Sequence, residues 1–114
     1  MDIFCYRYIL GFKTISKYCV IELKKDKCTK ESIQQIMKYV DWVNQEYAYG
    51  DYAMIEAYLI CSDFSKDIIT YKKEVCIRNY TKGRRPIISA SWNNIKFIKY
   101  TYHEQNGLTL KEVE

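Results

Sequence analysis

The segment Val20-Ile21-Glu22-Leu23-Lys24 has the pattern of an apolar strand that ends in a carboxylate and an ammonium group. Side chains alternate along a strand, so Glu22 and Lys24 lie on one face and the intervening Leu23 lies on the other. Two such charges at the end of a buried strand suit a hard metal ion and the water that it polarises. Most isolated copies of Glu-x-Lys are solvated charges at a strand end, so the flanking segments decide between these interpretations.

The segment before this strand brings a second carboxylate to the same place. Residues 2–10 and 17–24 are rich in β-branched and aromatic side chains, and Gly11 interrupts the pattern. This arrangement predicts a β-hairpin with its loop near Gly11. Antiparallel pairing then places Asp2 opposite Glu22 or its neighbour Lys24, whereas a slip of one residue would turn the aspartate to the other face.

A helix is expected directly after the strand. Thr29 can cap its N-terminus, and residues 30–47 contain neither proline nor glycine. Gln35 lies beside the apolar stripe of this helix. Alone it is an ordinary boundary residue, but after Glu-x-Lys it can lie against the strand end that carries the carboxylates. The apolar stripe itself repeats at helical spacing and consists of Ile33, Ile36, Met37, Val40 and Val43.

These segments resemble the PD-(D/E)xK nuclease superfamily, and most closely its RecB-like and archaeal structure-specific endonuclease branch. That branch has an aspartate on one strand, an apolar strand that runs into Glu-x-Lys, and a helix with Gln-x-x-x-Tyr. The matching residues here are Asp2, Glu22-Leu23-Lys24 and the helix segment 35–42. The resemblance covers residues 2–61, roughly half of the chain. It implies an α/β fold with a restriction-endonuclease-like core, in which a mixed β-sheet is flanked by helices.

The chain departs from the family pattern at its start. The family core begins with a helix and a strand that precede the aspartate strand, whereas this sequence starts almost at Asp2. The resemblance therefore implies that the first helix and strand of the core are missing. Either the chain is a fragment of a longer protein, or another segment or a partner chain replaces these elements.

The chemistry that the resemblance implies is metal-dependent hydrolysis of DNA by an endonuclease. Asp2, Glu22 and the backbone carbonyl of Leu23 would hold one or two Mg²⁺ or Mn²⁺ ions, which take oxygen ligands. Such an ion polarises the scissile phosphate and lowers the pKa of the attacking water. Lys24 would orient this water or stabilise charge on the phosphate, and Gln35 would hydrogen-bond the water or a metal ligand. Many such nucleases place two active sites across a duplex, so a homodimer is also expected.

A basic stretch favours a nucleic-acid partner. Basic side chains neutralise phosphates, and interleaved aromatic rings stack on bases, although a solvated helix end followed by a loop has the same composition. Gly83 and Pro86 predict a turn that exposes the arginines between them. The candidate nucleic-acid-binding residues are Lys72, Lys73, Arg78, Lys82, Arg84 and Arg85.

The remaining sequence continues the alternation of strands and helices. A nearly continuous apolar strand at 55–61 is expected to be buried on both faces and to run parallel to the Glu-x-Lys strand after a helical crossover. A second helix is expected at 66–79, and strands at 87–90 and 95–103. The polar tail from residue 104 predicts a frayed end or a short extension.

Composition sets wider limits. With 114 residues, of which 48% are hydrophobic, residues 1–114 are expected to form a single nuclease-like domain. No run of 18 apolar residues and no apolar leader occurs, so neither a membrane partner nor secretion is expected. Five cysteines without a Cys-x-x-Cys pair and a single histidine disfavour zinc and favour a reducing cytoplasm.

Two other functions remain open from the residues alone. A domain of the same fold with an incomplete acidic site would bind nucleic acid without cutting it, and the basic stretch would then carry the function. In the third case the chain is an interaction or assembly domain, and its Glu-x-Lys is a surface ion pair that contributes little to stability.

Overall fold

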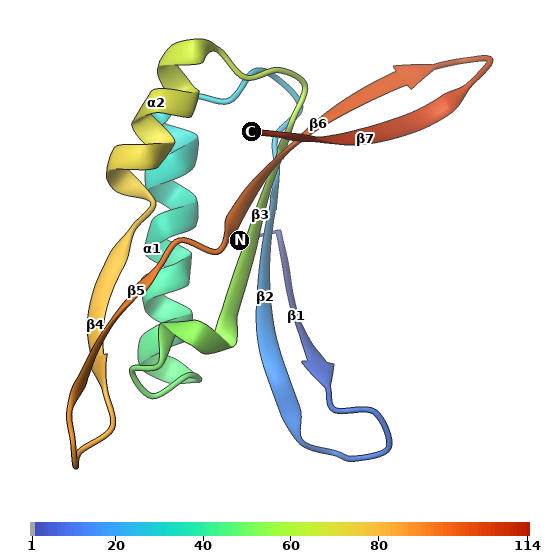
Figure 1. Ribbon diagram of the computed structural model, residues 1–114. Helices are drawn as coiled ribbons and strands as arrows, with labels where there is room; N and C mark the ends of the chain where they lie inside the picture. The colour runs from blue at the N-terminus through green and yellow to red at the C-terminus, as the bar shows by residue number, and fades with distance from the viewer. Residues whose placement is uncertain (1) are drawn as a thin grey trace.

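The computed structural model describes residues 2–114, and these form a five-stranded mixed sheet, a separate two-stranded ribbon and two α-helices that pack on one face of the sheet (Figure 1). The elements in chain order are β1 (Ile3–Tyr8), β2 (Ile15–Leu23), α1 (Lys30–Glu46), the 3-10 turn η1 (Tyr52–Met54), β3 (Ile55–Cys61), α2 (Lys66–Val75), β4 (Arg78–Lys82), β5 (Ile88–Trp92), β6 (Ile95–His103) and β7 (Gly107–Val113).

The sheet has the strand order β1-β2-β3-β6-β7. Its three central strands β2, β3 and β6 are parallel, and the edge strands β1 and β7 are antiparallel to their neighbours. The β1–β2 hairpin and the parallel crossover through α1 confirm two predictions from the sequence. The mixed α/β class is confirmed as well.

The core lies between the sheet and α1. Thr29 and Ser32 form a capping box that starts this helix, and its apolar stripe is buried against alternate residues of β2 and β3. Leu59 of β3 and Phe97 of β6 are fully buried on the same face. Burial of side chains this large stabilises the fold by about 2 kcal/mol each. The packing fixes the end of β2 relative to the start of α1.

The prediction that residues 55–61 are buried on both faces is wrong. Ile55, Ala57, Leu59 and Cys61 are buried, but the alternate residues of β3 are only half-buried. In the described part of the chain both helices cover the same face, so the other face of the sheet has no helical layer (Figure 1). The continuous apolar run therefore predicted the parallel strand correctly, but it did not predict that one face of this strand is left without a helix.

The second helix and the tail also differ from expectation. Helix α2 ends at Val75, with Cys76 as its C-cap, because residues 78–82 pair with β5. The tail from residue 104 turns back at Gly107 and pairs with β6 as strand β7. Predicted strands at 55–61 and 95–103 match β3 and β6, and the strand predicted at 87–90 is β5, shifted by one or two residues.

The β4–β5 ribbon projects away from the sheet beside α1 (Figure 1). Its base is anchored twice: Arg78 pairs with Asp41 of α1, and the buried Trp92 indole donates a hydrogen bond to the carbonyl of Ile55 at 2.8 Å. Its tip, residues 83–87, is fully exposed. The basic turn expected from Gly83 and Pro86 is therefore the tip of this ribbon. No helix within residues 2–114 is both long and apolar enough to cross a membrane.

Candidate functional site

Glu22, Lys24 and Gln35 meet at the carboxyl end of β2. The backbone N–H of Lys24 donates to the carbonyl of Ile60 at 2.8 Å, which continues the parallel pairing with β3 beyond Leu23. Gln35 faces this strand end from the second turn of α1, whose start is set by the Thr29 cap. The sequence places these residues well apart, and the short crossover brings them together.

The Lys24 ammonium group is held between two oxygen atoms. Its Nζ donates to Gln35 Oε1 at 3.1 Å and lies 4.0 Å from Glu22 Oε2. The Lys24 side chain is 32% exposed, whereas that of Glu22 is 1% exposed. A buried carboxylate is costly unless a cation compensates it, and Lys24 supplies a positive charge from the solvent side. The three side chains form one polar cluster, which Lys24 connects to solvent.

Asp2 lies at the rim of this cluster. The ladder pairs Ile3 with Ile21, and continuing it by one residue places Asp2 across from Glu22. The exposed Asp2 carboxylate accepts a hydrogen bond from the backbone N–H of Leu23 at 2.6 Å. This charge-assisted bond ties the aspartate to the end of β2.

The donor set suits a hard divalent cation. Asp2, Glu22 and the carbonyl of Leu23 offer only oxygen atoms, and Mg²⁺ binds through one or two carboxylates while it keeps several waters. Within residues 2–114 there is no cluster of three or more histidine, cysteine, aspartate or glutamate side chains that could hold a metal ion. A cation here would therefore rest on two carboxylates, a main-chain oxygen and water.

Two buried thiols border the cluster, and the sequence analysis did not connect them. Cys28 follows the Glu-x-Lys strand and Cys61 ends β3. The thiol of Cys28 donates to the carbonyl of Thr29 at 3.6 Å. Its interaction with the neighbouring Cys61 thiol raises the pKa of Cys28 and lowers that of Cys61; the charge of Lys24 also lowers the pKa of Cys61, against the effect of burial. Cys28 lies just before the Thr29 cap and Cys61 ends β3, and neither position carries a sequence signal that the two thiols meet.

Asp63 and Lys99 form an ion pair at the same edge of the sheet, with 3.4 Å between Lys99 Nζ and Asp63 Oδ1. The backbone N–H of Phe64 donates to Asp63, and this bond together with Lys99 lowers the pKa of the Asp63 carboxyl. Asp63 precedes the α2 cap, which is Ser65. Charged residues thus lie at the carboxyl ends of β2 and β3 and at Lys99, the position on β6 that pairs with the end of β3. Ligands commonly bind at this edge of an α/β sheet.

The basic residues predicted to bind nucleic acid are found in three places. Lys72 and Lys73 lie in the last turn of α2, where the Lys72 ammonium stacks over the Phe97 ring at 4.8 Å from its centroid. Arg78 is engaged by Asp41 through two hydrogen bonds of 2.8 and 2.9 Å. The other three, Lys82, Arg84 and Arg85, are exposed at the end of the β4–β5 ribbon.

Comparison of the chain with models of protein families, with curated proteins and with solved structures finds no match.

Proposed function

We propose that this chain is a metal-dependent endonuclease that hydrolyses DNA, built on a restriction-endonuclease-like core. The observation that carries the proposal is the cluster at the end of β2, in which the Lys24 ammonium lies 3.1 Å from Gln35 Oε1 and 4.0 Å from Glu22 Oε2. If Glu-x-Lys were only a pair of solvated charges at a strand end, both side chains would be exposed. Instead, the Glu22 side chain is 1% exposed, and the adjacent Lys24 is hydrogen-bonded to Gln35 of the helix.

Each residue has a role that its position supports. Asp2 and Glu22, with the Leu23 carbonyl, would hold Mg²⁺ or Mn²⁺ at the rim of the sheet. A bound ion would polarise the scissile phosphate and lower the pKa of its water.

Lys24 reaches the solvent side of the cluster, where its ammonium group would contact the phosphate and stabilise the negative charge that develops on it. Gln35 holds this ammonium group through the carbonyl of its amide. Because Gln35 and Lys24 belong to a helix and a strand of the packed core, the group is positioned before substrate binds.

The test is DNA cleavage in Mg²⁺ or Mn²⁺ by the wild type and by Glu22→Gln, Lys24→Ala and Gln35→Ala. We expect Glu22→Gln and Lys24→Ala to reduce the cleavage rate by about 10²-fold or more. Lys25→Ala is the matched control, since Lys25 is the exposed neighbour of Lys24. Circular dichroism and thermal melting confirm that each variant is folded. Wild-type cleavage by folded Glu22→Gln and Lys24→Ala would refute the proposal.

A second candidate function is nucleic-acid binding without cleavage, and the ribbon tip favours it. Lys82, Arg84 and Arg85 extend into solvent on a two-stranded ribbon, an element that the DNA major groove admits. In EDTA, Arg84→Ala/Arg85→Ala should weaken binding and reduce its salt dependence, whereas Lys13→Ala on the exposed β1–β2 loop should not. Binding in EDTA without cleavage in Mg²⁺ would select this function over the nuclease.

A further inference from the structure

We propose that the uncovered face of the sheet is the interface of a homodimer, in which it packs against the same face of a second copy of this chain. This open face is the side opposite α1 and α2. The proposal does not rest on the nuclease function, because Glu22 and Lys24 point to the other face. The side chains that surround a shallow hollow of about 320 Å³ on the open face are Ile21, Tyr58, Ile60, Ile98, Leu110 and Glu112.

The strands of the open face are of a kind that is normally buried on both faces. Strands β2, β3 and β6 are parallel, and parallel sheets are usually buried on both sides. Here Ile60 of β3 and Ile98 of β6 are paired neighbours, and each is half-buried at the centre of the open face. Towards the edges, Leu23 is 49% and Leu110 56% exposed. A band of apolar side chains thus crosses the open face from β2 to β7.

The surface area indicates how large the missing cover is. The chain has an accessible surface of 8088 Å², whereas a folded monomer of its 13.7 kDa mass exposes about 6,600 Å². Its radius of gyration of 15.6 Å likewise exceeds the value of about 13 Å expected for this length. The excess is about 1,500 Å², and a standard dimer buries about 800 Å² per subunit. The projecting hairpins account for part of the excess, and one interface on the open face accounts for the rest.

The charges of the open face favour a second copy as the partner. A two-fold interface must be self-complementary, so it needs both signs of charge on one surface. The open face has Lys96 on β6 and Glu112 on the neighbouring β7, both exposed. In a two-fold pairing the lysine of one copy can therefore lie against the acid of the other. DNA would require a uniformly basic surface instead.

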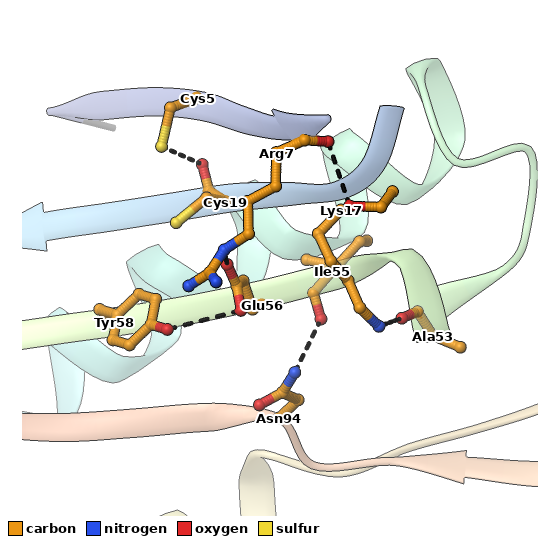
Figure 2. Close-up of polar contacts among 10 residues, drawn as sticks. Cys5, Arg7, Lys17, Cys19, Ala53, Ile55, Glu56, Tyr58 and Asn94 are labelled. Atoms are coloured by element: carbon orange, nitrogen blue, oxygen red, sulfur yellow. Dashed lines mark hydrogen bonds and ion pairs between the residues drawn. The ribbon is translucent and has the colours of Figure 1, made fainter. Parts of the chain in front are cut away.

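Arg7, Glu56 and Tyr58, which also lie on the open face, are already paired with one another. Arg7 Nε donates to Glu56 Oε1 at 2.6 Å, and the Tyr58 hydroxyl donates to Glu56 Oε2 at 3.4 Å. Figure 2 shows these side chains meeting across β1, β2 and β3, with a helix behind the sheet. A partner that covers them does not leave an unpaired charge, which would otherwise cost several kcal/mol.

The first experiment measures the mass of the full chain by sedimentation equilibrium. We expect twice the chain mass of 13.7 kDa, and a fall to the monomer mass in Ile98→Lys/Leu110→Lys. Leu10→Lys is the matched control, because Leu10 is 96% exposed in the β1–β2 loop, away from the open face. A monomeric wild type at about 100 µM, or a dimer that Leu10→Lys disrupts and the open-face variant does not, would overturn the proposal.

The second experiment avoids substitutions of half-buried residues. Lys96→Glu makes the open face more acidic, and Glu112→Lys makes it more basic, both at exposed positions. Each variant alone should show a dimer dissociation constant raised about tenfold or more by like-charge repulsion, and their equimolar mixture should form a heterodimer. Two variants that self-associate like the wild type, or a mixture that stays monomeric, would contradict a face-to-face pairing.

Discussion

The Arg78–Asp41 pair allows a quantitative test of what holds the β4–β5 ribbon in place. The guanidinium group donates to both carboxylate oxygens at 2.8 and 2.9 Å, and the hydroxyl of Tyr52 donates to the same carboxylate at 2.9 Å. The hydrogen bonding with Asp41 raises the pKa of Arg78. A bidentate arrangement of this kind is among the stronger hydrogen-bonding geometries in proteins.

The expected magnitude follows from geometry and exposure. Hydrogen bonds to charged groups contribute about 1.5–3 kcal/mol, while fully exposed ion pairs contribute less than about 1 kcal/mol. The side chain of Arg78 is 28% exposed and that of Asp41 43%, so solvent screens the pair in part. We therefore expect a coupling energy of about 1–2 kcal/mol between the two residues.

The assay is a double-mutant cycle. Urea denaturation of the wild type, Arg78→Ala, Asp41→Ala and the double variant gives four free energies of unfolding, and their differences give the coupling energy. Raising NaCl to about 0.5 M should reduce the coupling, because ions screen the half-exposed pair. A coupling below about 0.3 kcal/mol at low salt would refute the assignment of Arg78 as an anchor.

The same substitution separates structure from function. If Arg78 is an anchor, Arg78→Ala lowers stability and changes the affinity for DNA less than Arg84→Ala does, since Arg84 has no comparable role in packing. A larger loss of affinity in Arg78→Ala would instead place Arg78 at the nucleic-acid interface.

Two further predictions concern the second anchor at the base of the ribbon and the edge of the site. Trp92→Phe removes the shorter of two hydrogen bonds to the carbonyl of Ile55, that from the indole N–H at 2.8 Å, and leaves the one from Asn94 Nδ2 at 3.5 Å, so thermal or urea unfolding should show a loss of about 1 kcal/mol; a loss under about 0.3 kcal/mol would contradict it. The Phe64 N–H and Lys99 hold the folded pKa of Asp63 below its usual 3.8, so its stabilisation is fully present above about pH 4 and disappears as pH falls through the lower folded value. The wild type should then melt above Asp63→Asn at neutral pH and converge with it in strong acid, and a gap that widens toward acid would contradict this reasoning.

Sequence patterns that extend over a few residues were sufficient to predict β3, β6 and the start of α1. The alternation of residues 95–103 and the apolar run 55–61 predicted β6 and β3 with their correct bounds, and Thr29 predicted the start of α1. These signals depend on side-chain periodicity and on the capping preference of a hydroxyl, both of which act within a few residues.

Features that depend on distant partners were missed. No proline or glycine interrupts the helix expected at 66–79, yet the chain leaves the helix at Cys76 and pairing of Arg78 with Trp92 starts strand β4. Strand β7 exists because β6 offers it an edge, which the composition of the tail does not reveal. In the site, the approach of Lys24 to Gln35 followed from the expected crossover. The contact between Cys28 and Cys61 depended on how the loop before α1 packs against the end of β3, where the Cys28 N–H donates to the carbonyl of Asp63 at 3.0 Å.

The separateness of the β4–β5 ribbon has a consequence for amide hydrogen exchange. The strands β4 and β5 pair only with each other, while β3 lies between two parallel neighbours at the centre of the sheet. A two-stranded ribbon has little stability of its own, so its amides can exchange through a local opening that leaves the sheet intact. The amides of β3 become accessible only when the whole fold opens. The basic tip can therefore adjust its shape to a bound molecule while the end of β2 remains fixed.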